Sequence, residues 1–289
     1  MNGENKIKFD YAQIGGVKLH YAAAGDGERL VILLHGFPEF WYSWRHQLVA
    51  LSDEYTVIAP DMRGYNLSDK PINIADYDIN KLVDDITGLI NYFRRENAAI
   101  VGHDWGAAVA WAIAQNHPEY VWKLAALQVP PISVWRKNQS FKQFLASWYM
   151  FFLQIPKLPE WLMTRSNFAM LENALKNTTA EKDVFKPEDI ERYKESWSEP
   201  FALTAMINYY RANVFTRLFS KSESQEKIRV PTLFIYGEKD HAILPETVKG
   251  VGEAVDAPFE QFHIPDAGHW VQQEASETVT EILRDFLAE

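Results

Sequence analysis

The sequence predicts an α/β fold, in which a mostly parallel, doubly wound sheet is interrupted by a helical insertion. Short, continuously apolar runs, typical of strands buried on both faces of a parallel sheet, alternate with stretches of helical periodicity. The alternation stops after residue 133, where the sequence becomes helix-like and rich in aromatic residues. We therefore expect a core built from 1–133 and 227–289 around a helical cap at 134–226.

The elements of the core follow in order. The run Leu-Val-Ile-Leu-Leu at 30–34 predicts a buried strand. Apolar residues at helical spacing predict a helix at about 78–95, and Asp78 stands where an N-cap would. The other expected elements are strands at 55–60, 98–102, 121–128, 232–237 and 259–264, and helices near 106–116, 245–254 and 275–288. Such alternation suits parallel strands, which need helical crossovers.

Composition narrows the choice of partner. The chain has 289 residues, a formal net charge of -10 and no cysteine. An acidic surface repels phosphate groups, so neither nucleic acid nor an anionic membrane face is expected as a partner. The lack of cysteine excludes disulfides, thiolate metal sites and cysteine nucleophiles. The acidic charge favours a small neutral molecule as the partner. Because the chain begins with a polar stretch and contains no membrane-spanning apolar run, we expect a cytoplasmic protein.

A motif of small residues around Asp104 is the first candidate for chemistry. The segment Val-Gly-His-Asp-Trp-Gly-Ala at 101–107 runs from a predicted strand end into a predicted helix start. A nucleophile elbow holds its central residue on a strained turn and needs small neighbours, which Gly102 and Gly106 provide. Taken alone, the motif is also compatible with a tight turn that carries an exposed aspartate or an N-cap.

An aspartate in this position selects the reaction. A carboxylate that attacks saturated carbon forms an ester, which water can hydrolyse, whereas serine would form an ether. Epoxides and alkyl halides therefore fit Asp104 as substrates, and carboxylic esters and amides fit poorly.

The second step needs a base and a residue that orients it. His269 lies on a loop between the last predicted strand and the last helix, and Asp240 follows the strand at 232–237. The order nucleophile, acid, histidine is the one expected of such a catalytic triad. Glu238 is the local competitor of Asp240, and the segment after the strand at 121–128 offers no carboxylate.

An oxyanion hole requires two backbone donors. The N–H of Trp105, directly after the nucleophile, is one candidate. The N–H of Phe37, in the turn His-Gly-Phe-Pro at 35–38, is the other. This turn is also compatible with a plain strand end.

Four segments together resemble the soluble epoxide hydrolases of the α/β-hydrolase superfamily. They are HGFPEFWYSWRHQ (35–47), DMRGYNLSDKP (61–71), VGHDWGAAVAW (101–111) and GHW (268–270). The resemblance implies an α/β-hydrolase fold with a helical cap. It also implies that two cap tyrosines bind and protonate the epoxide oxygen.

The resemblance assigns those tyrosines to Tyr149 and Tyr210. Tyr149 precedes a Gln-X-Pro by five residues, and Tyr210 stands immediately before arginine, as in the family's two motifs. Tyr209 and Tyr210 would lie about 100° apart on a helix, so at most one is expected to face the cleft, and the resemblance alone selects Tyr210. A phenol stays protonated at neutral pH and can donate to a developing alkoxide.

Three further positions bear on the resemblance. Glu39 and His103 match family positions that help to order water near the nucleophile, although either is also compatible with a structural hydrogen-bonding role. Asn66 stands where glycine is common in the family, and we expect the turn to survive because asparagine tolerates positive φ.

The sequence thus predicts an epoxide hydrolase that forms vicinal diols from small apolar epoxides through an ester on Asp104, without metal or organic cofactor. A haloalkane dehalogenase would share the aspartate nucleophile. It would also need a second halide donor, for example an asparagine in place of Phe37, but no pair of tyrosines. A noncatalytic ligand-binding protein of the same fold is the alternative from another class.

Overall fold

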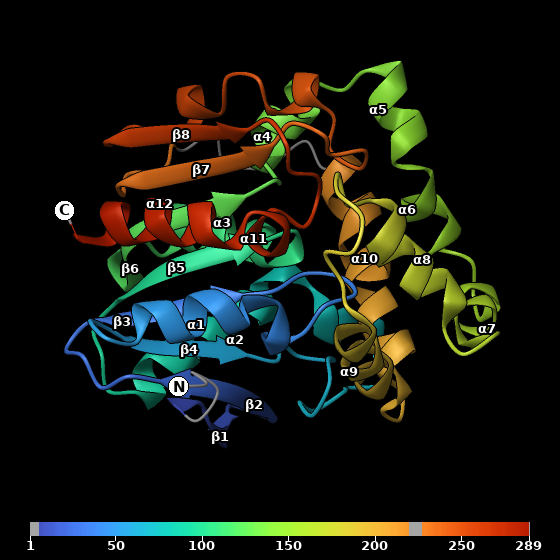
Figure 1. Cartoon of the computed structure of the whole chain (residues 1–289), viewed down its shortest axis with the longest axis horizontal. Coiled ribbons are helices and arrows are strands. Elements are labelled where there is room, and N and C mark those ends of the chain that lie inside the picture. The colour runs from blue at the N-terminus through green and yellow to red at the C-terminus, as the bar shows by residue number, and fades with distance from the viewer. Residues whose placement is uncertain (1–5, 220–226, 289) are drawn as a thin grey trace.

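An eight-stranded sheet forms the centre of the molecule (Figure 1). The computed structural model describes residues 6–219 and 227–288, and the strand order is β1-β2-β4-β3-β5-β6-β7-β8. The strands are β1 (Lys8–Ile14), β2 (Val17–Ala24), β3 (Leu30–Leu34), β4 (Thr56–Pro60), β5 (Ala98–His103), β6 (Val121–Leu127), β7 (Thr232–Gly237) and β8 (Phe259–Ile264). Strand β2 pairs antiparallel with β1 and β4, and the other pairs are parallel. The predicted fold class is confirmed.

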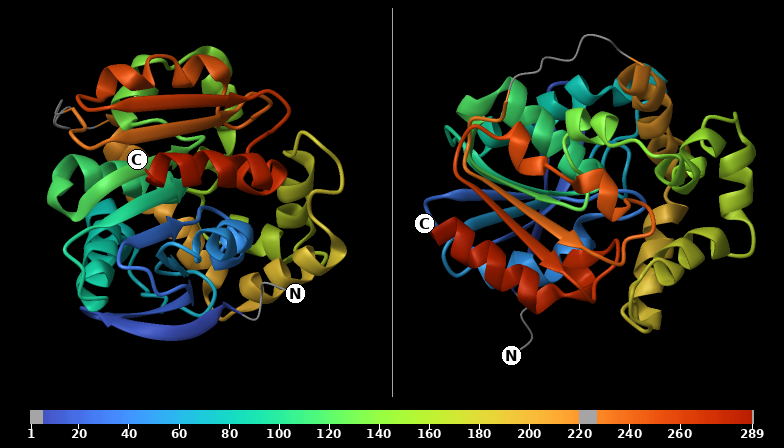
Figure 2. Two further views of the ribbon diagram at one scale, coloured as in Figure 1. Left: turned by 60° about the vertical axis from the view of Figure 1, so that its left-hand side comes forward. Right: turned by 90° about the horizontal axis from the view of Figure 1, so that it is seen from above.

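Helices cover both faces of the sheet. The core helices are α1 (Arg45–Leu51), α2 (Ile79–Tyr92), α3 (Trp105–Asn116), α11 (Val271–Glu274) and α12 (Ser276–Ala288). Helices α1 and α12 pack together on one face, and α2 and α3 pack together on the other (Figure 2). Every residue of β3 and β5 is buried, as expected for strands that are covered on both sides.

Between β6 and β7 the described chain forms only helices, which lie beside one end of the sheet (Figure 1). They are α4 (Ile132–Lys137), α5 (Phe141–Ala146), α6 (Trp148–Phe152), α7 (Leu158–Thr164), α8 (Ala169–Asn177), α9 (Pro187–Ser198) and α10 (Ala202–Phe219). We call 132–219 the helical insertion. It lies where the cap was expected, although the expected last residues, 220–226, are outside the described part of the chain.

Local backbone geometry corrects several sequence predictions. The helix expected at 245–254 is divided into two short 3-10 turns, Pro245–Val248 and Val251–Ala254, because Gly250 between them has φ 75°. The helix expected to reach residue 95 ends at Tyr92, and Arg94 has φ 55°. Left-handed residues of this kind end regular helices.

Other local predictions are confirmed. The side chain of Asp78 caps α2 by accepting a hydrogen bond from the backbone N–H of Asn80. Asn66 has φ 40°, so asparagine does occupy a left-handed turn position there. The sequence reading missed the β1–β2 hairpin and α1. Strand β1 is mostly exposed and therefore lacks the apolar run that marked the other strands.

A buried ion pair joins the loop after β4 to α2 and, indirectly, to the helical insertion. The guanidinium of Arg63 donates to both carboxylate oxygens of Asp85, at 2.7 and 2.6 Å. The backbone carbonyl of Arg63 accepts a hydrogen bond from the Tyr209 hydroxyl on α10 at 2.7 Å. The ion pair thus fixes a loop on which the insertion also rests.

We expect the substitution Asp85→Ala to destabilise the fold by about 3–5 kcal/mol, because it leaves the Arg63 guanidinium buried without its carboxylate. Urea unfolding of both variants measures the difference. The matched control is Asp84→Ala, whose exposed neighbouring carboxylate should matter by less than about 0.5 kcal/mol. Equal effects of the two substitutions would contradict a structural role for the ion pair.

Candidate active site

Asp104 lies on a sharp turn between β5 and α3. Its backbone has φ 50° and ψ -117°, a strained combination for a residue with a side chain. The turn needs glycine on both sides: a Cβ at Gly102 would lie 2.3 Å from the carbonyl oxygen of Gly106, and one at Gly106 would lie 2.1 Å from that of Leu34. The close approach of β3, β5 and α3 therefore places the carboxylate at the carboxyl end of the central strand β5.

The turn after β3 holds one oxygen of this carboxylate. The backbone N–H of Phe37 donates to Asp104 Oδ1 at 2.8 Å. A Cβ at Gly36 would come within 2.4 Å of the same oxygen, so this approach also requires glycine. The other oxygen, Oδ2, lies 3.9 Å from Nε2 of His269. The two oxygens of Asp104 thus have different environments.

His269 is held between two carboxylates. Its Nδ1 donates to Asp240 Oδ2 at 2.7 Å, and its Nε2 faces Asp104. Asp240 is buried, and its Oδ1 accepts hydrogen bonds from the backbone N–H groups of Ala242 and Ile243 at 2.7 and 3.0 Å. The three residues predicted from chain order therefore lie together. Glu238, the competing acid, contacts the exposed His263 instead.

The electrostatic surroundings favour the protonated form of His269. Burial alone would lower the pKa of this imidazole, but the carboxylates of Asp240, Asp104 and Glu39 outweigh burial and raise the pKa to about 9. At neutral pH the imidazolium therefore lies beside the Asp104 carboxylate.

Glu39 and His103 form a buried support beneath this loop. His103 Nε2 donates to the backbone carbonyl of His269 at 2.8 Å, and His103 Nδ1 lies 3.0 Å from Glu39 Oε2. The side-chain amides of Gln272 and Gln273 donate to Glu39. Glu39 and His103 are fully buried, and their contacts hold the backbone of the loop that carries His269.

Gln128, which the sequence does not mark as a site residue, contacts Asp240 directly. Its side-chain amide donates to Asp240 Oδ2 and to the carbonyl of Gly268, both at 2.8 Å, and its Oε1 accepts from the N–H of Gly237 at 2.6 Å. With φ 67°, Gln128 also ends β6 one residue earlier than expected. Its place directly after a core strand is the one signal in the sequence, and an uncharged amide there does not mark a catalytic acid.

The two tyrosines lie on different helices of the insertion and line the same cavity as Asp104. Tyr149 on α6 and Tyr210 on α10 have ring centroids 6.0 Å apart. Burial, followed by the nearby Asp104 carboxylate, raises the pKa of both phenols, and a hydrogen bond between the Tyr210 and Trp105 side chains partly offsets the rise for Tyr210. Both phenols are therefore protonated at neutral pH. Tyr209 points elsewhere, to the carbonyl of Arg63.

The cavity extends away from Asp104 along one face of α3. Its lining includes Ala108, Trp111, Ala112 and Gln115, which recur at helical spacing. At 1.5 Å per residue, the distance from Asp104 to Gln115 along the helix is roughly 16 Å. The space therefore suits an elongated, largely apolar molecule with its reactive end at the carboxylate.

Comparisons with known proteins agree with this geometry. Residues 29–276 match the family described as alpha/beta hydrolase fold. The AB hydrolase superfamily protein YfhM of Bacillus subtilis is 40% identical and covers 97% of this chain and 98% of its own. Epoxide hydrolase 1 of Caenorhabditis elegans is 39% identical, over 96% of this chain and 69% of its own. A Bacillus megaterium epoxide hydrolase, solved with an inhibitor, has a TM-score of 0.90 and 33% identity, over 97% of this chain and 100% of its own.

We expect the substitution Asp104→Asn to lower the pKa of His269 from about 9, because the change removes one of the anions that favour the imidazolium. An NMR titration of the imidazole ring measures the shift. In the control Asp266→Asn, an exposed carboxylate nearby in the chain is neutralised, and the pKa should stay near the wild-type value. An unchanged pKa in Asp104→Asn would show that Asp104 does not control the charge of His269.

Proposed function

Because the chain belongs to the α/β-hydrolase fold family and is a hydrolase that shares this family with the epoxide hydrolases, we propose that it converts small apolar epoxides to vicinal diols. One observation carries the proposal: a carboxylate and two protonated phenols line the same cavity. An epoxide needs both at once, a nucleophile for its carbon and an acid for its oxygen.

The first step opens the ring. Oδ2 of Asp104 attacks one epoxide carbon while Oδ1 stays bound to the Phe37 N–H, so a C–O bond to the enzyme forms as the ring C–O bond breaks. The released alkoxide accepts a proton from Tyr149 or Tyr210. The product of this step is an ester between Asp104 and a β-hydroxyalkyl group.

Ester formation also switches the role of His269. When Asp104 becomes a neutral ester, one of the anions that raise the pKa of the imidazole disappears, so the imidazolium gives up its proton more readily. The proton that His269 gives up replaces the one that the tyrosine has donated. His269 then stands next to the ester as a neutral base, still oriented by Asp240.

The second step hydrolyses the ester. His269 takes a proton from water, and the hydroxide oxygen attacks the carboxyl carbon of Asp104. Negative charge then develops on Oδ1, where the Phe37 N–H already donates and where we propose the Trp105 N–H as the second donor. When the intermediate collapses, the bond between the carboxyl carbon and Oδ2 breaks, and the leaving alkoxide takes the proton of the added hydroxyl to become the diol. The Asp104 carboxylate is restored with one oxygen from water.

The surroundings of the nucleophile favour this reaction over dehalogenation. A departing halide needs N–H donors beside the attacked carbon. The side chain of Phe37 provides only an aromatic ring, and the side chain of Trp105 is hydrogen-bonded to Tyr210. The helical insertion carries both phenols, and we propose that it serves as the cap that closes the site over the substrate.

We expect the substitution His269→Gln to stop the reaction at the ester. With styrene oxide as the substrate, mass spectrometry of the intact protein should show an adduct of one substrate mass, while diol formation falls about 10²- to 10⁴-fold. Wild type should form diol without a lasting adduct. The control His263→Gln, at an exposed position, should behave like wild type.

Two results would contradict the proposed reaction. Diol formation that survives in Asp104→Ala would exclude Asp104 as the nucleophile. Release of bromide from 1-bromobutane, without diol from styrene oxide, would instead identify a dehalogenase.

We expect Tyr149→Phe and Tyr210→Phe each to lower kcat for styrene oxide by about 10²-fold, because each removes one donor to the alkoxide. Steady-state kinetics and thermal unfolding measured together test the assignment. Tyr209→Phe is the control: it removes the hydrogen bond to the Arg63 carbonyl and should cost stability while leaving kcat near the wild-type value. The reverse pattern for Tyr209 and Tyr210 would overturn the choice between them.

A further inference from the structure

Helix α5 and the first residue of α6 carry large apolar side chains on the outside of the protein. Phe141, Phe144, Leu145 and Trp148 follow the spacing of one helical face. Their exposed fractions are 76%, 50%, 53% and 58%. We call these four residues the outer stripe. Single exposed apolar residues are ordinary, but four on one face over two consecutive helices are not.

The inner face of α5, together with Ser147 at its end, is polar. Gln143 is fully buried, and its amide donates to the carbonyl of Ala242 at 2.7 Å and accepts from the N–H of Leu244 at 2.8 Å and the hydroxyl of Thr247 at 2.7 Å. Ser147, one turn further on, is also buried and bonded to Gln143. A helix on a water-soluble protein normally shows the opposite arrangement. The outer stripe is therefore not a by-product of core packing.

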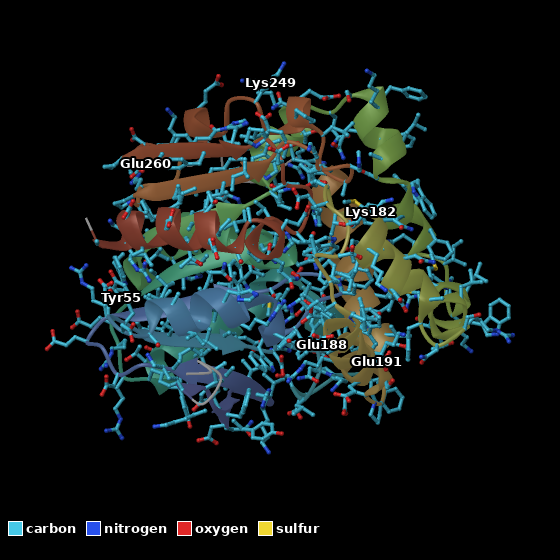
Figure 3. The ribbon with its side chains drawn as sticks, in the orientation of Figure 1. Tyr55, Lys182, Glu188, Glu191, Lys249 and Glu260 are labelled. Carbon is cyan, nitrogen blue, oxygen red and sulfur yellow. The ribbon has the colours of Figure 1, made fainter. Side chains whose placement is uncertain are left out.

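The apolar surface continues towards α7. Ile155, Leu158 and Trp161 have exposed fractions of 43%, 40% and 52%. Helices α5, α6 and α7 form the edge of the molecule that lies farthest from the sheet (Figures 1 and 2). Many side chains project outward along this edge (Figure 3). The surface thus lies where a large flat partner can approach it.

The charge of this segment differs from that of the whole protein. Residues 141–165 contain three cations, Lys142, Lys157 and Arg165, and a single acid, Glu160. Glu160 is engaged by Arg211 through two hydrogen bonds. The net charge of the chain is -10, so a positive, aromatic-rich edge stands out against it. Aromatic and aliphatic side chains flanked by lysine and arginine suit the interface of an anionic lipid bilayer.

We propose that the outer stripe binds the surface of an anionic lipid membrane. This goes beyond the proposed reaction, because the binding needs none of the catalytic groups. It differs from the expectation, drawn from the net charge alone, that an anionic membrane face is not a partner. Helix α6 also joins the surface to the site, since Trp148 belongs to the stripe while Tyr149 and Met150 line the cavity. An apolar epoxide dissolved in the bilayer would thus meet the protein next to its cavity.

Vesicle flotation tests the proposal with the full-length protein. Wild type should float with vesicles made of equal parts phosphatidylcholine and phosphatidylglycerol. Added salt, or vesicles of pure phosphatidylcholine, should reduce the fraction of protein that floats. In the double variant Phe141→Glu, Leu145→Glu, vesicle binding should be weaker by at least about tenfold, because the variant places two acids in the stripe. The control Ile72→Glu, Phe262→Glu adds the same charge at exposed apolar positions outside this edge and should keep most of the binding.

Folding and activity are monitored separately. The stripe variant should keep its melting temperature and its turnover of dissolved styrene oxide. Asp104→Ala should bind vesicles as wild type does, so failure of the proposed reaction leaves this test intact. Wild type that stays unbound at low salt would overturn the proposal, as would equal binding by the stripe and control variants. If wild type forms a dimer and does not bind vesicles, while the stripe variant is monomeric, the proposal is also overturned. The stripe would then be a contact between two copies of the chain.

Discussion

The site depends on how closely three backbones approach one another around Asp104. Gly36, Gly102 and Gly106 leave room where any Cβ would collide with a neighbour, and the strained turn at Asp104 exists only within that close contact. The same approach brings the Phe37 N–H to one oxygen of the carboxylate. The backbone of the core therefore positions Asp104 and the Phe37 N–H, whereas Tyr149 and Tyr210 come from the insertion.

Buried charge is the second constraint, and the fold meets it by giving each charge several partners. Asp240 receives four hydrogen bonds, from His269, Gln128 and two backbone N–H groups. Glu39 is likewise surrounded by donors. These hydrogen bonds offset the cost of burying the two carboxylates. Asp240 and Glu39, together with Asp104, raise the pKa of His269 to about 9.

The sequence predicted those features that depend on strong local patterns. Buried strands are predicted by apolar runs, and the elbow around Asp104 is predicted by its fixed spacing of small residues. Gln128 escaped notice because an amide carries no charge signature and its partners are distant in sequence. The β1–β2 hairpin escaped because β1 is largely exposed. The outer stripe could not be foreseen, because the period of a helix does not say which of its faces meets the core.

Gln143 has one more consequence. The short segment after Asp240 is gripped from two directions: Ala242 and Ile243 donate to the acid, while Gln143 bonds Ala242 and Leu244 from the insertion. Movement of the insertion away from the core on this side would therefore pull on the segment that holds the Asp240 carboxylate. Helix α5 is thus part of the support of Asp240, although it lies on the outside of the molecule.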